Sequence, residues 1–196
     1  MCGFVGALGL GSGSAADRTT LESMTDALSH RGPDGRGIEL DGGIGLGHRR
    51  LRVIDLSTKA DQPMWNLARD LAIVFNGEIY NYRELRRELA QSGARLRTWS
   101  DTEVVLELFA REGVSALRRL DGMFAFAVWD KRKGRLFLAR DRSGKKPLYI
   151  YEDGRRFLFA SEIKAIQRHP AVAREPNFDA LPYYLTYGYF PQPLTA

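Results

Sequence analysis

The sequence has 196 residues, of which 44% are hydrophobic and 27% charged, and its formal net charge is +5. This length and balance suit one globular domain with enough apolar residues for a packed core. A single cysteine excludes an intramolecular disulfide and a cluster of thiolate metal ligands. The three histidines are far apart in the sequence, so we expect no metal site.

No segment reaches the about 20 consecutive apolar residues of a membrane helix, and the first residues lack the features of a signal peptide. Together with the lone cysteine, this favours a cytoplasmic protein with no membrane partner. Much of the basic excess lies in residues 130–156 and could attract nucleic acid. Because these charges alternate with apolar positions and no nucleic-acid-binding motif accompanies them, we expect solvated surface charges and no nucleic-acid partner.

Several apolar runs along the chain have the composition of β-strands. Turn sequences flank them: LDGG at 40–43, KRKG at 131–134 and EDGR at 152–155. Connections this short predict antiparallel pairing, since parallel strands need a longer crossover. The runs are GFVGAL (3–8), IGLGHRRL (44–51), LAIVFNGE (71–78), MFAFAVWD (123–130), RLFLARD (135–141), PLYIYE (147–152) and RFLFAS (156–161).

Helix starts are indicated by the spacing of a capping box, in which a cap residue and a Glu three positions later bond each other's backbone N–H. The pairs with this spacing are Thr19 with Glu22, Asn81 with Glu84, and Ser100 with Glu103. Apolar residues follow at helical intervals: Leu21, Met24 and Leu28, then Leu85 and Leu89, then Val104 and Leu108. The sequence therefore predicts a helix at each pair.

Helices grouped among antiparallel strands indicate an α+β fold in which helical layers enclose the sheets. We expect residues 1–170 to form one domain. Residues 171–196 are rich in aromatic residues and proline, and we interpret them as a bridge toward a second domain absent from this chain. The run 178–187 is compatible with a helix, although Pro182 limits where that helix can start.

The only cysteine, Cys2, directly precedes the first predicted strand. A thiol with its ordinary pKa of about 8.5 needs a base to act as a nucleophile. His30 or His48 could serve, but no motif supports either pair. Removal of Met1 would instead give Cys2 a free α-amine, whose ordinary pKa of about 7.7–8.0 leaves much of it unprotonated at neutral pH. This is the logic of an N-terminal nucleophile; the alternative is a small buried hydrophobic residue.

A series of motifs follows Cys2 in order: MCGFVG, SHRGPDGRG, GHRRLRVIDLS, QPM, FNGEIYNYREL, SDTEVVLELF, LDGMFAFAVWD, ARDRSGKKPLYI and FASEIKAI. Together they closely resemble the glutaminase domain of class II glutamine amidotransferases, which are N-terminal nucleophile hydrolases. The resemblance extends from Cys2 to about Ile166 and is nearest to glutamine-dependent asparagine synthetases, since HRGPDG and NGEIYNY look like that type. It implies a four-layer αββα sandwich of antiparallel sheets and hydrolysis of L-glutamine to L-glutamate and ammonia.

The resemblance implies that Cys2 attacks the side-chain amide of glutamine and forms a thioester. Negative charge then develops on the amide oxygen, and the family pattern assigns its stabilisation to the side-chain amide of Asn76 and the backbone N–H of Gly77. Neutral donors of this kind can be held in place before the reaction. Without the motif series, an Asn-Gly pair would more simply be read as a tight turn.

Glutamine is a zwitterion, so its site needs one cation and one anion. The resemblance assigns Arg50 to the α-carboxylate, which a planar guanidinium can bind with two hydrogen bonds. It assigns Asp101 to the α-ammonium group, although an acid in the first turn of a helix is also favourable on its own. The other substrate-binding residues that the resemblance implies are Leu51, Val53, Ile54, Asn76 and Glu78.

In the resembling family, the ammonia passes to a C-terminal synthetase domain that uses ATP and Mg²⁺. This sequence has no SGGxDS-like motif and no Gly-rich phosphate loop, so we expect no cofactor and no metal in it. We expect L-glutamine and the synthetase domain as partners, and a homodimer is compatible with the sequence. Two alternatives stay open: a catalytically silent regulatory or assembly domain that retains Met1, and an amidotransferase whose acceptor is not aspartate.

Overall fold

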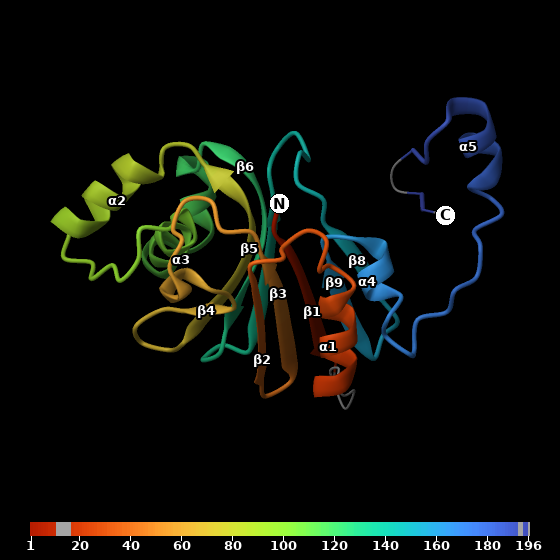
Figure 1. Cartoon of the computed structure of the whole chain (residues 1–196), viewed down its shortest axis with the longest axis horizontal. Helices are drawn as coiled ribbons and strands as arrows, with labels where there is room; N and C mark the ends of the chain where they lie inside the picture. Colours follow the sequence, from red (N-terminus) through yellow and green to blue (C-terminus); the bar gives the residue numbers. More distant parts are fainter. Residues whose placement is uncertain (11–16, 192–193, 196) are drawn as a thin grey trace.

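The computed structural model describes residues 1–10, 17–191 and 194–195. Two antiparallel sheets pack face to face in it, with helices on their outer faces (Figure 1). The first sheet has the order β2-β3-β1-β9-β8 and the second the order β4-β5-β6-β7. Their strands are β1 (Gly3–Gly9), β2 (Gly35–Asp41), β3 (Ile44–Arg50), β4 (Met64–Trp65), β5 (Leu71–Ile79), β6 (Gly122–Asp130), β7 (Arg135–Arg140), β8 (Tyr149–Glu152) and β9 (Arg156–Ala160).

Helices cover the outer face of each sheet. Helices α1 (Arg18–Asp26) and α4 (Ile163–Ile166) pack on the first sheet. Helices α2 (Tyr82–Gln91) and α3 (Asp101–Glu112) lie on the side of the second sheet, and a 3₁₀ segment, Gly113–Arg119, follows α3. A shorter 3₁₀ segment, Thr58–Ala60, precedes β4. This arrangement confirms the predicted α+β fold with four αββα layers.

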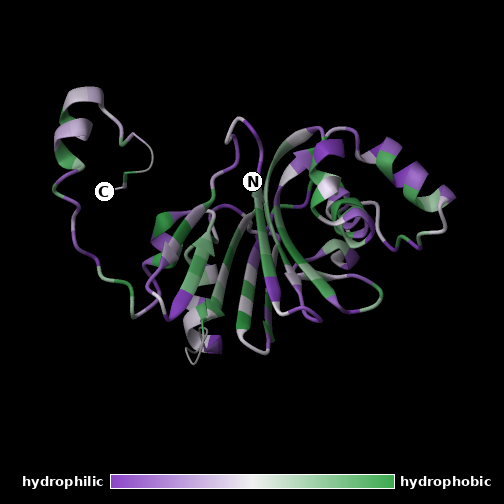
Figure 2. Ribbon diagram, turned by 180° about the vertical axis from the view of Figure 1, so that it is seen from behind, coloured by the Kyte–Doolittle hydropathy of each residue, from purple (hydrophilic) through white to green (hydrophobic). Residues whose placement is uncertain are grey.

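Apolar residues form three clusters, one in each space between neighbouring layers. Alternate residues of a strand point to opposite faces of its sheet, so one strand can contribute to two clusters. In β5, for example, Val74 faces the other sheet, whereas Phe75 faces α3. In β1, Phe4 faces the second sheet and Val5 faces α1. Figure 2 shows the hydrophobic residues in green along the central strands, and alternating colours along the amphipathic helix α2.

The same alternation brings the predicted nucleophile and the predicted oxyanion donor to one place. Cys2 precedes β1 with the parity of Phe4, and Asn76 has the parity of Val74, so both lie on the inner faces of the two sheets. The N-terminus lies between the two sheets in Figure 1. Because Gly3 pairs with Arg49, Arg50 at the end of β3 lies beside Cys2. The sheets therefore position residues that are far apart in the sequence.

The capping predictions were right about which helices form but only partly right about their caps. Helix α1 begins earlier than Thr19, because the side chain of Asp17 accepts the N–H of Thr20 at 2.7 Å. Asn81 precedes α2 as predicted, but its side chain bonds the backbone of Arg119 and Asp121 and caps nothing in the helix. The third prediction, Ser100 with Glu103, is half confirmed.

Ser100 caps α3, since its Oγ accepts the N–H of Glu103 at 3.2 Å. The carboxylate of Glu103 does not return to Ser100. It accepts the backbone N–H groups of Arg97 and Thr98 instead, at 2.7–3.0 Å. Glu103 therefore organises the loop before the helix, a role that the capping-box spacing does not predict.

Two short or exposed strands were not predicted. Strand β2 contains three Gly or charged residues before Ile38 and lies at a sheet edge, and β4 has only two residues. Helix α5 (Leu181–Tyr187) lies within the predicted run 178–187, with Pro182 in its first turn, where proline is tolerated. Figure 1 shows α5 apart from the sheets. Across the described residues, no helix is long and apolar enough to cross a membrane.

Candidate active site

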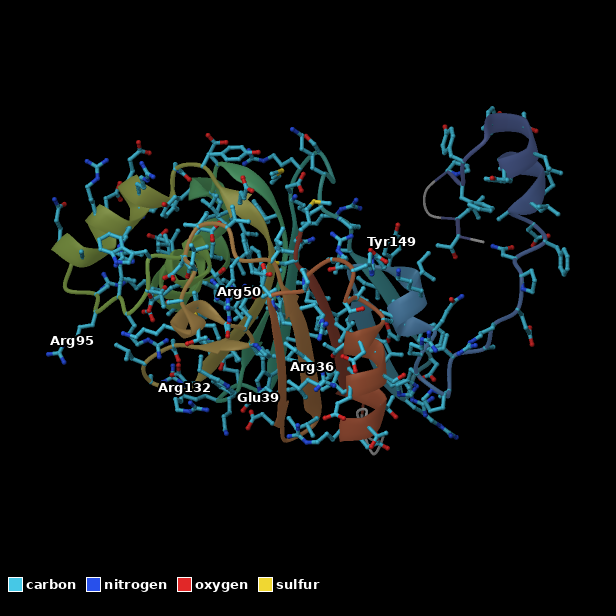
Figure 3. The ribbon with its side chains drawn as sticks, in the orientation of Figure 1. Arg36, Glu39, Arg50, Arg95, Arg132 and Tyr149 are labelled. Carbon is cyan, nitrogen blue, oxygen red and sulfur yellow. The ribbon has the colours of Figure 1, made fainter. Side chains whose placement is uncertain are left out.

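A pocket of about 100 Å³ opens where β1 begins and where β3 and β5 end, between the inner faces of the sheets. It brings together every site residue that the sequence singles out: Cys2, Arg50, Leu51, Val53, Ile54, Asn76, Gly77, Glu78 and Asp101. Met1 forms part of its wall, so removal of Met1 would enlarge it. Figure 3 shows the labelled Arg50 at the centre of the molecule, whereas Arg95 and Arg132 lie at its periphery.

The thiol of Cys2 is held against the backbone of Leu51. Its Sγ lies 3.4 Å from the N–H of Leu51, as acceptor, and 3.6 Å from the carbonyl of the same residue, as donor. The carbonyl of Cys2 accepts Nε of Arg31 at 2.9 Å, and Arg31 also bonds Glu162 at 2.8 Å. Burial raises the pKa of the Cys2 thiol, although the N–H of Leu51 and the nearby chain amine act against this. The resting thiol is therefore protonated at neutral pH and needs a base.

The two histidines that could pair with Cys2 have other partners. Nε2 of His48 lies 3.0 Å from the carbonyl of Phe75, and burial lowers the pKa of His48 to about 4. Nε2 of His30 lies 3.0 Å from a carboxylate oxygen of Glu162. Within the described part of the chain, neither ring bonds to the thiol. If Met1 were removed, the α-amine of Cys2 would be available as a base, which is the arrangement of an N-terminal nucleophile.

The edge of β5 that faces the pocket carries backbone N–H groups of alternate residues. Tyr80, just beyond the strand, bonds Asp121 on the β6 side, so Phe75, Gly77 and Ile79 present their backbone groups to the opposite edge. The N–H of Phe75 donates to Gln62, and that of Ile79 donates to Asp101. Between them, the N–H of Gly77 donates to no side chain of the described residues and lies at the pocket.

A glycine is needed at position 77 because β6 runs very close behind it. A Cβ at this position would lie 2.3 Å from the carbonyl oxygen of Met123. Any larger residue would push β5 away from β6 and move the N–H that faces the pocket. The Asn-Gly pair is thus part of a strand and not the tight turn that the dipeptide suggests in isolation.

Asn76 is a buried polar side chain, with 1% of its surface exposed, on the inner face of β5. Its Nδ2 has no hydrogen-bond partner among the described residues. A buried amide donor without a partner costs about 1–3 kcal/mol, and such groups are rare in folded proteins. Asn76 therefore offers a donor that a molecule bound in the pocket could satisfy.

Arg50 lies in the pocket, with 6% of its surface exposed, and is held in place by several acceptors. Nη1 donates to the carbonyl of Ser57 at 2.7 Å and to Asp61 at 2.6 Å, and Nη2 donates to the carbonyl of Asp55. A guanidinium has five N–H donors, so Nε and one hydrogen of Nη2 remain. Nε and Nη2 form one edge of the guanidinium plane, which is an edge that can bind a carboxylate bidentately.

Asp101 is the first residue of α3, and only 5% of its surface is exposed. Its two carboxylate oxygens accept the N–H of Ile79 at 3.1 Å and that of Thr102 at 2.9 Å. Burial nevertheless raises its pKa to about 6, and the charge of Glu78 acts in the same direction. Among the described residues, no cationic side chain forms an ion pair with this buried carboxylate, so it is suited to an ammonium group.

The remaining predicted residues lie around the rim. Val53, in the segment after β3, is 60% exposed, and Glu78 follows Gly77 in β5. The sequence reasoning did not single out several other wall residues: Asp55, Gln62, Phe75, Ser100, Thr102 and Lys146. For Gln62 a signal existed, since it lies within the QPM motif, but an isolated Gln carries no chemistry of its own. The described residues contain no cluster of metal-ligating side chains.

Comparison with known proteins agrees with this geometry. The Glutamine amidotransferase domain model matches residues 1–196. A Methanocaldococcus jannaschii protein named "Putative asparagine synthetase [glutamine-hydrolyzing] 2" is 38% identical over 98% of this chain and 40% of its own length. "Asparagine synthetase [glutamine-hydrolyzing] 1" of Bacillus subtilis is 39% identical over 100% of this chain and 31% of its own length. The chain thus spans less than half the length of these relatives.

A solved structure has the same fold. The glutamine phosphoribosylpyrophosphate amidotransferase of B. subtilis aligns with a TM-score of 0.72 and 25% identity over 85% of this chain and 43% of its own. The cysteine at position 2, an unpaired amide donor and a buried carboxylate thus share one pocket in a fold that an amidotransferase also has. With the family model matching its whole length, the chain belongs to the glutamine amidotransferase domain family.

Proposed function

We propose that this chain hydrolyses L-glutamine to L-glutamate and ammonia through a thioester on Cys2. In the binding step, Arg50 takes the α-carboxylate of glutamine and Asp101 its α-ammonium group. Glu78 and the segment from Leu51 to Ile54 complete the wall of the pocket. The side-chain amide of glutamine then lies toward Cys2 and the exposed edge of β5.

The chemistry requires that Met1 has been removed. The free α-amine of Cys2 takes the thiol proton, and Sγ attacks the amide carbon of glutamine. Asn76 Nδ2 and the N–H of Gly77 stabilise the oxyanion, and the protonated amine donates its proton to the leaving nitrogen as ammonia departs. The amine then accepts a proton from water, which attacks the thioester and releases glutamate with the thiol restored.

The single observation that carries this proposal is the unpaired Nδ2 of Asn76, buried at the pocket. Folding leaves this donor unsatisfied at a cost, and an oxyanion in the pocket would satisfy it. The free N–H of Gly77 lies on the next residue. The register of β1 and β5 supports the nucleophile assignment, because it places Cys2 and Asn76 on facing sheet surfaces.

The names of the relatives suggest where the ammonia goes. We propose that it reaches an ATP-dependent synthetase domain of the asparagine synthetase type, which would hold any ATP and Mg²⁺ and is not part of these 196 residues. The acceptor of the ammonia is aspartate or another carboxylate. A cytoplasmic location and a homodimer also belong to this proposal.

A second candidate function is a catalytically silent domain that retains Met1. One contact favours it: Nζ of Lys146 lies 3.0 Å from Sδ of Met1, which lines the pocket. An amine acylated by methionine cannot serve as the base. In this alternative the fold would act in regulation or assembly.

The state of the N-terminus therefore tests the proposed function. Purified chain of known intact mass is assayed for glutamate and ammonia release from L-glutamine. We expect activity only in protein that lacks Met1, and none when an added peptide blocks the α-amine of Cys2. Equal activity in protein that retains Met1 would contradict the mechanism, and inactivity of protein that begins at Cys2 would favour the silent domain.

Asn76→Ala tests the oxyanion assignment. We expect kcat to fall by about 10²–10³-fold, as for removal of one oxyanion donor in other enzymes, with little change in KM. The melting temperature should hardly fall, because Nδ2 makes no hydrogen bond in the folded protein. A large loss of stability with unchanged kcat would show that Asn76 has a structural role only.

A further inference from the structure

Gln62 connects the two parts of the candidate site, although no chemistry is assigned to it. It lines the pocket, and 5% of its surface is exposed. Its Oε1 accepts the N–H of Phe75 at 2.6 Å, and its Nε2 donates to Oγ1 of Thr102 at 3.2 Å. Phe75 directly precedes Asn76, and Thr102 directly follows Asp101. One side-chain amide thus bonds the neighbour of the oxyanion donor and the neighbour of the predicted ammonium partner.

The bond to Phe75 replaces a missing strand. Strand β4 has two residues and pairs with Ala72 and Ile73, so the edge of β5 has no strand partner from Phe75 onward. Side chains bond this edge instead: Gln62 accepts the N–H of Phe75, and Nε2 of His48 lies 3.0 Å from its carbonyl. The backbone that enters Asn76 and Gly77 is therefore held at both of its polar groups.

The position of Gln62 is itself fixed by the first sheet. A Cβ on Gly37 of β2 would lie 1.9 Å from the carbonyl oxygen of Gln62, so the backbone around Gln62 packs directly on that strand. Both hydrogen-bonding ends of the Gln62 amide are used, which determines its orientation. Gln62 is thus in contact with β2, β5 and the start of α3 at once.

We infer that Gln62 is a positioning residue, which sets the distance between the oxyanion donors on β5 and the ammonium-binding carboxylate of Asp101. This inference rests on the proposed function. Gln62 touches neither the reacting atoms nor the substrate amine in this role; it acts through Phe75 and Thr102. Loss of its bond to Thr102 would let the start of α3 shift while Asn76 stays held. Binding of the ammonium group would then weaken selectively.

Thr102→Val tests this inference, with Thr102→Ser as the matched variant that keeps the hydroxyl. Valine keeps the branched shape, so only the acceptor of the Gln62 amide is lost. Two quantities are measured in each protein: KM for L-glutamine, and the Ki of glutaramate, which is glutamine without its α-amino group. The Ki is obtained as inhibition of glutamine hydrolysis, so glutaramate need not itself be hydrolysed.

We expect Thr102→Val to raise KM for glutamine by about 5- to 10-fold, the effect of one hydrogen bond, and to change the Ki of glutaramate less than about twofold. Thr102→Ser should restore KM to within about twofold of the wild type. An equal rise in both constants, or no rise in either, would overturn the inference. A wild-type protein that releases no glutamate would instead refute the proposed function.

Gln62→Leu provides a second variant, because it also removes the bond to Phe75. We expect it to lower kcat as well as to raise KM, since the backbone before Asn76 loses its partner. A normal kcat in a folded Gln62→Leu protein would contradict the part of the inference that concerns β5. Circular dichroism establishes that each variant is folded before its kinetics are compared.

Discussion

Cys2→Ala is expected to abolish glutamate release, with kcat falling by about 10⁴-fold or more. Without Sγ no thioester can form. Water in the pocket is a much weaker nucleophile than a thiolate and cannot replace it. The fold should survive, because the two contacts of Sγ, at 3.4 and 3.6 Å, are weak and both are made to one residue. The measurement is glutamate release in stopped assays, with the melting temperature as the check on folding.

Cys2→Ser serves as the control for binding. Serine keeps the size of the side chain but has a much less acidic hydroxyl, so we expect almost no turnover while glutamine still binds to Arg50 and Asp101. Glutamine should therefore raise the melting temperature of Cys2→Ser, because a ligand that binds only the folded protein stabilises it. Glutamate release by Cys2→Ala at the wild-type rate would exclude Cys2 as the nucleophile.

The fold could be predicted well from local patterns where the strands are long apolar runs and the turns between them are short. Strands β5 and β6 combine long apolar runs with clear ends, and both form within a residue or two of the predicted ranges. Strand β2 was missed because it lies at an edge and has little apolar content, so its pairing with β3 depends on tertiary context.

The caps show why helix starts are harder to predict than helices. Asn81 has the right spacing, but the backbone of Arg119 and Asp121, some 38–40 residues later, offers it other partners. The carboxylate of Glu103 likewise bonds the preceding loop. Short polar side chains bond whichever backbone group lies nearest in the folded chain, and sequence spacing does not reveal that group.

Some residues of the candidate site could likewise be predicted from the sequence, and others could not. Cys2, Asn76 and Asp101 could be singled out because they lie in motifs that resemble those of a known family, which assigns a role to each of them. Gln62 could not, because its position between Phe75 and Thr102 exists only after β2, β5 and α3 have packed together. Supporting residues of this kind have no sequence signature beyond the motif in which they occur.

Asp101→Asn is expected to weaken glutamine hydrolysis strongly and to change how stability depends on pH. The variant loses the buried anion that we propose binds the ammonium group, so kcat/KM should fall by about 10²–10³-fold. In the wild type, kcat/KM should begin to fall below pH of about 8, where the α-amine takes up a proton, and should fall more steeply below about 6, where Asp101 takes up a second one. The variant keeps only the dependence on the amine, so its profile should be less steep in this range.

The pKa of Asp101 also makes a prediction about folding. The pKa is about 6 in the folded protein and 3.8 for the ordinary group, so the fold binds this proton more tightly than the unfolded chain does. That contribution to stability is fully present below pH of about 4 and is lost as the pH rises through 6. By pH 7.5 the loss is about 3 kcal/mol, an order-of-magnitude figure from about 1.4 kcal/mol for each pKa unit.

Asparagine cannot ionise, so Asp101→Asn does not undergo this loss. The free energy of unfolding of the variant minus that of the wild type should therefore rise by this amount between pH 4 and 7.5. Denaturant unfolding at several pH values measures the difference. A difference that stays constant with pH would mean that Asp101 titrates normally. A rising difference, with the loss of activity, would mean that the carboxylate that binds the ammonium group also destabilises the fold at the pH where it is ionised.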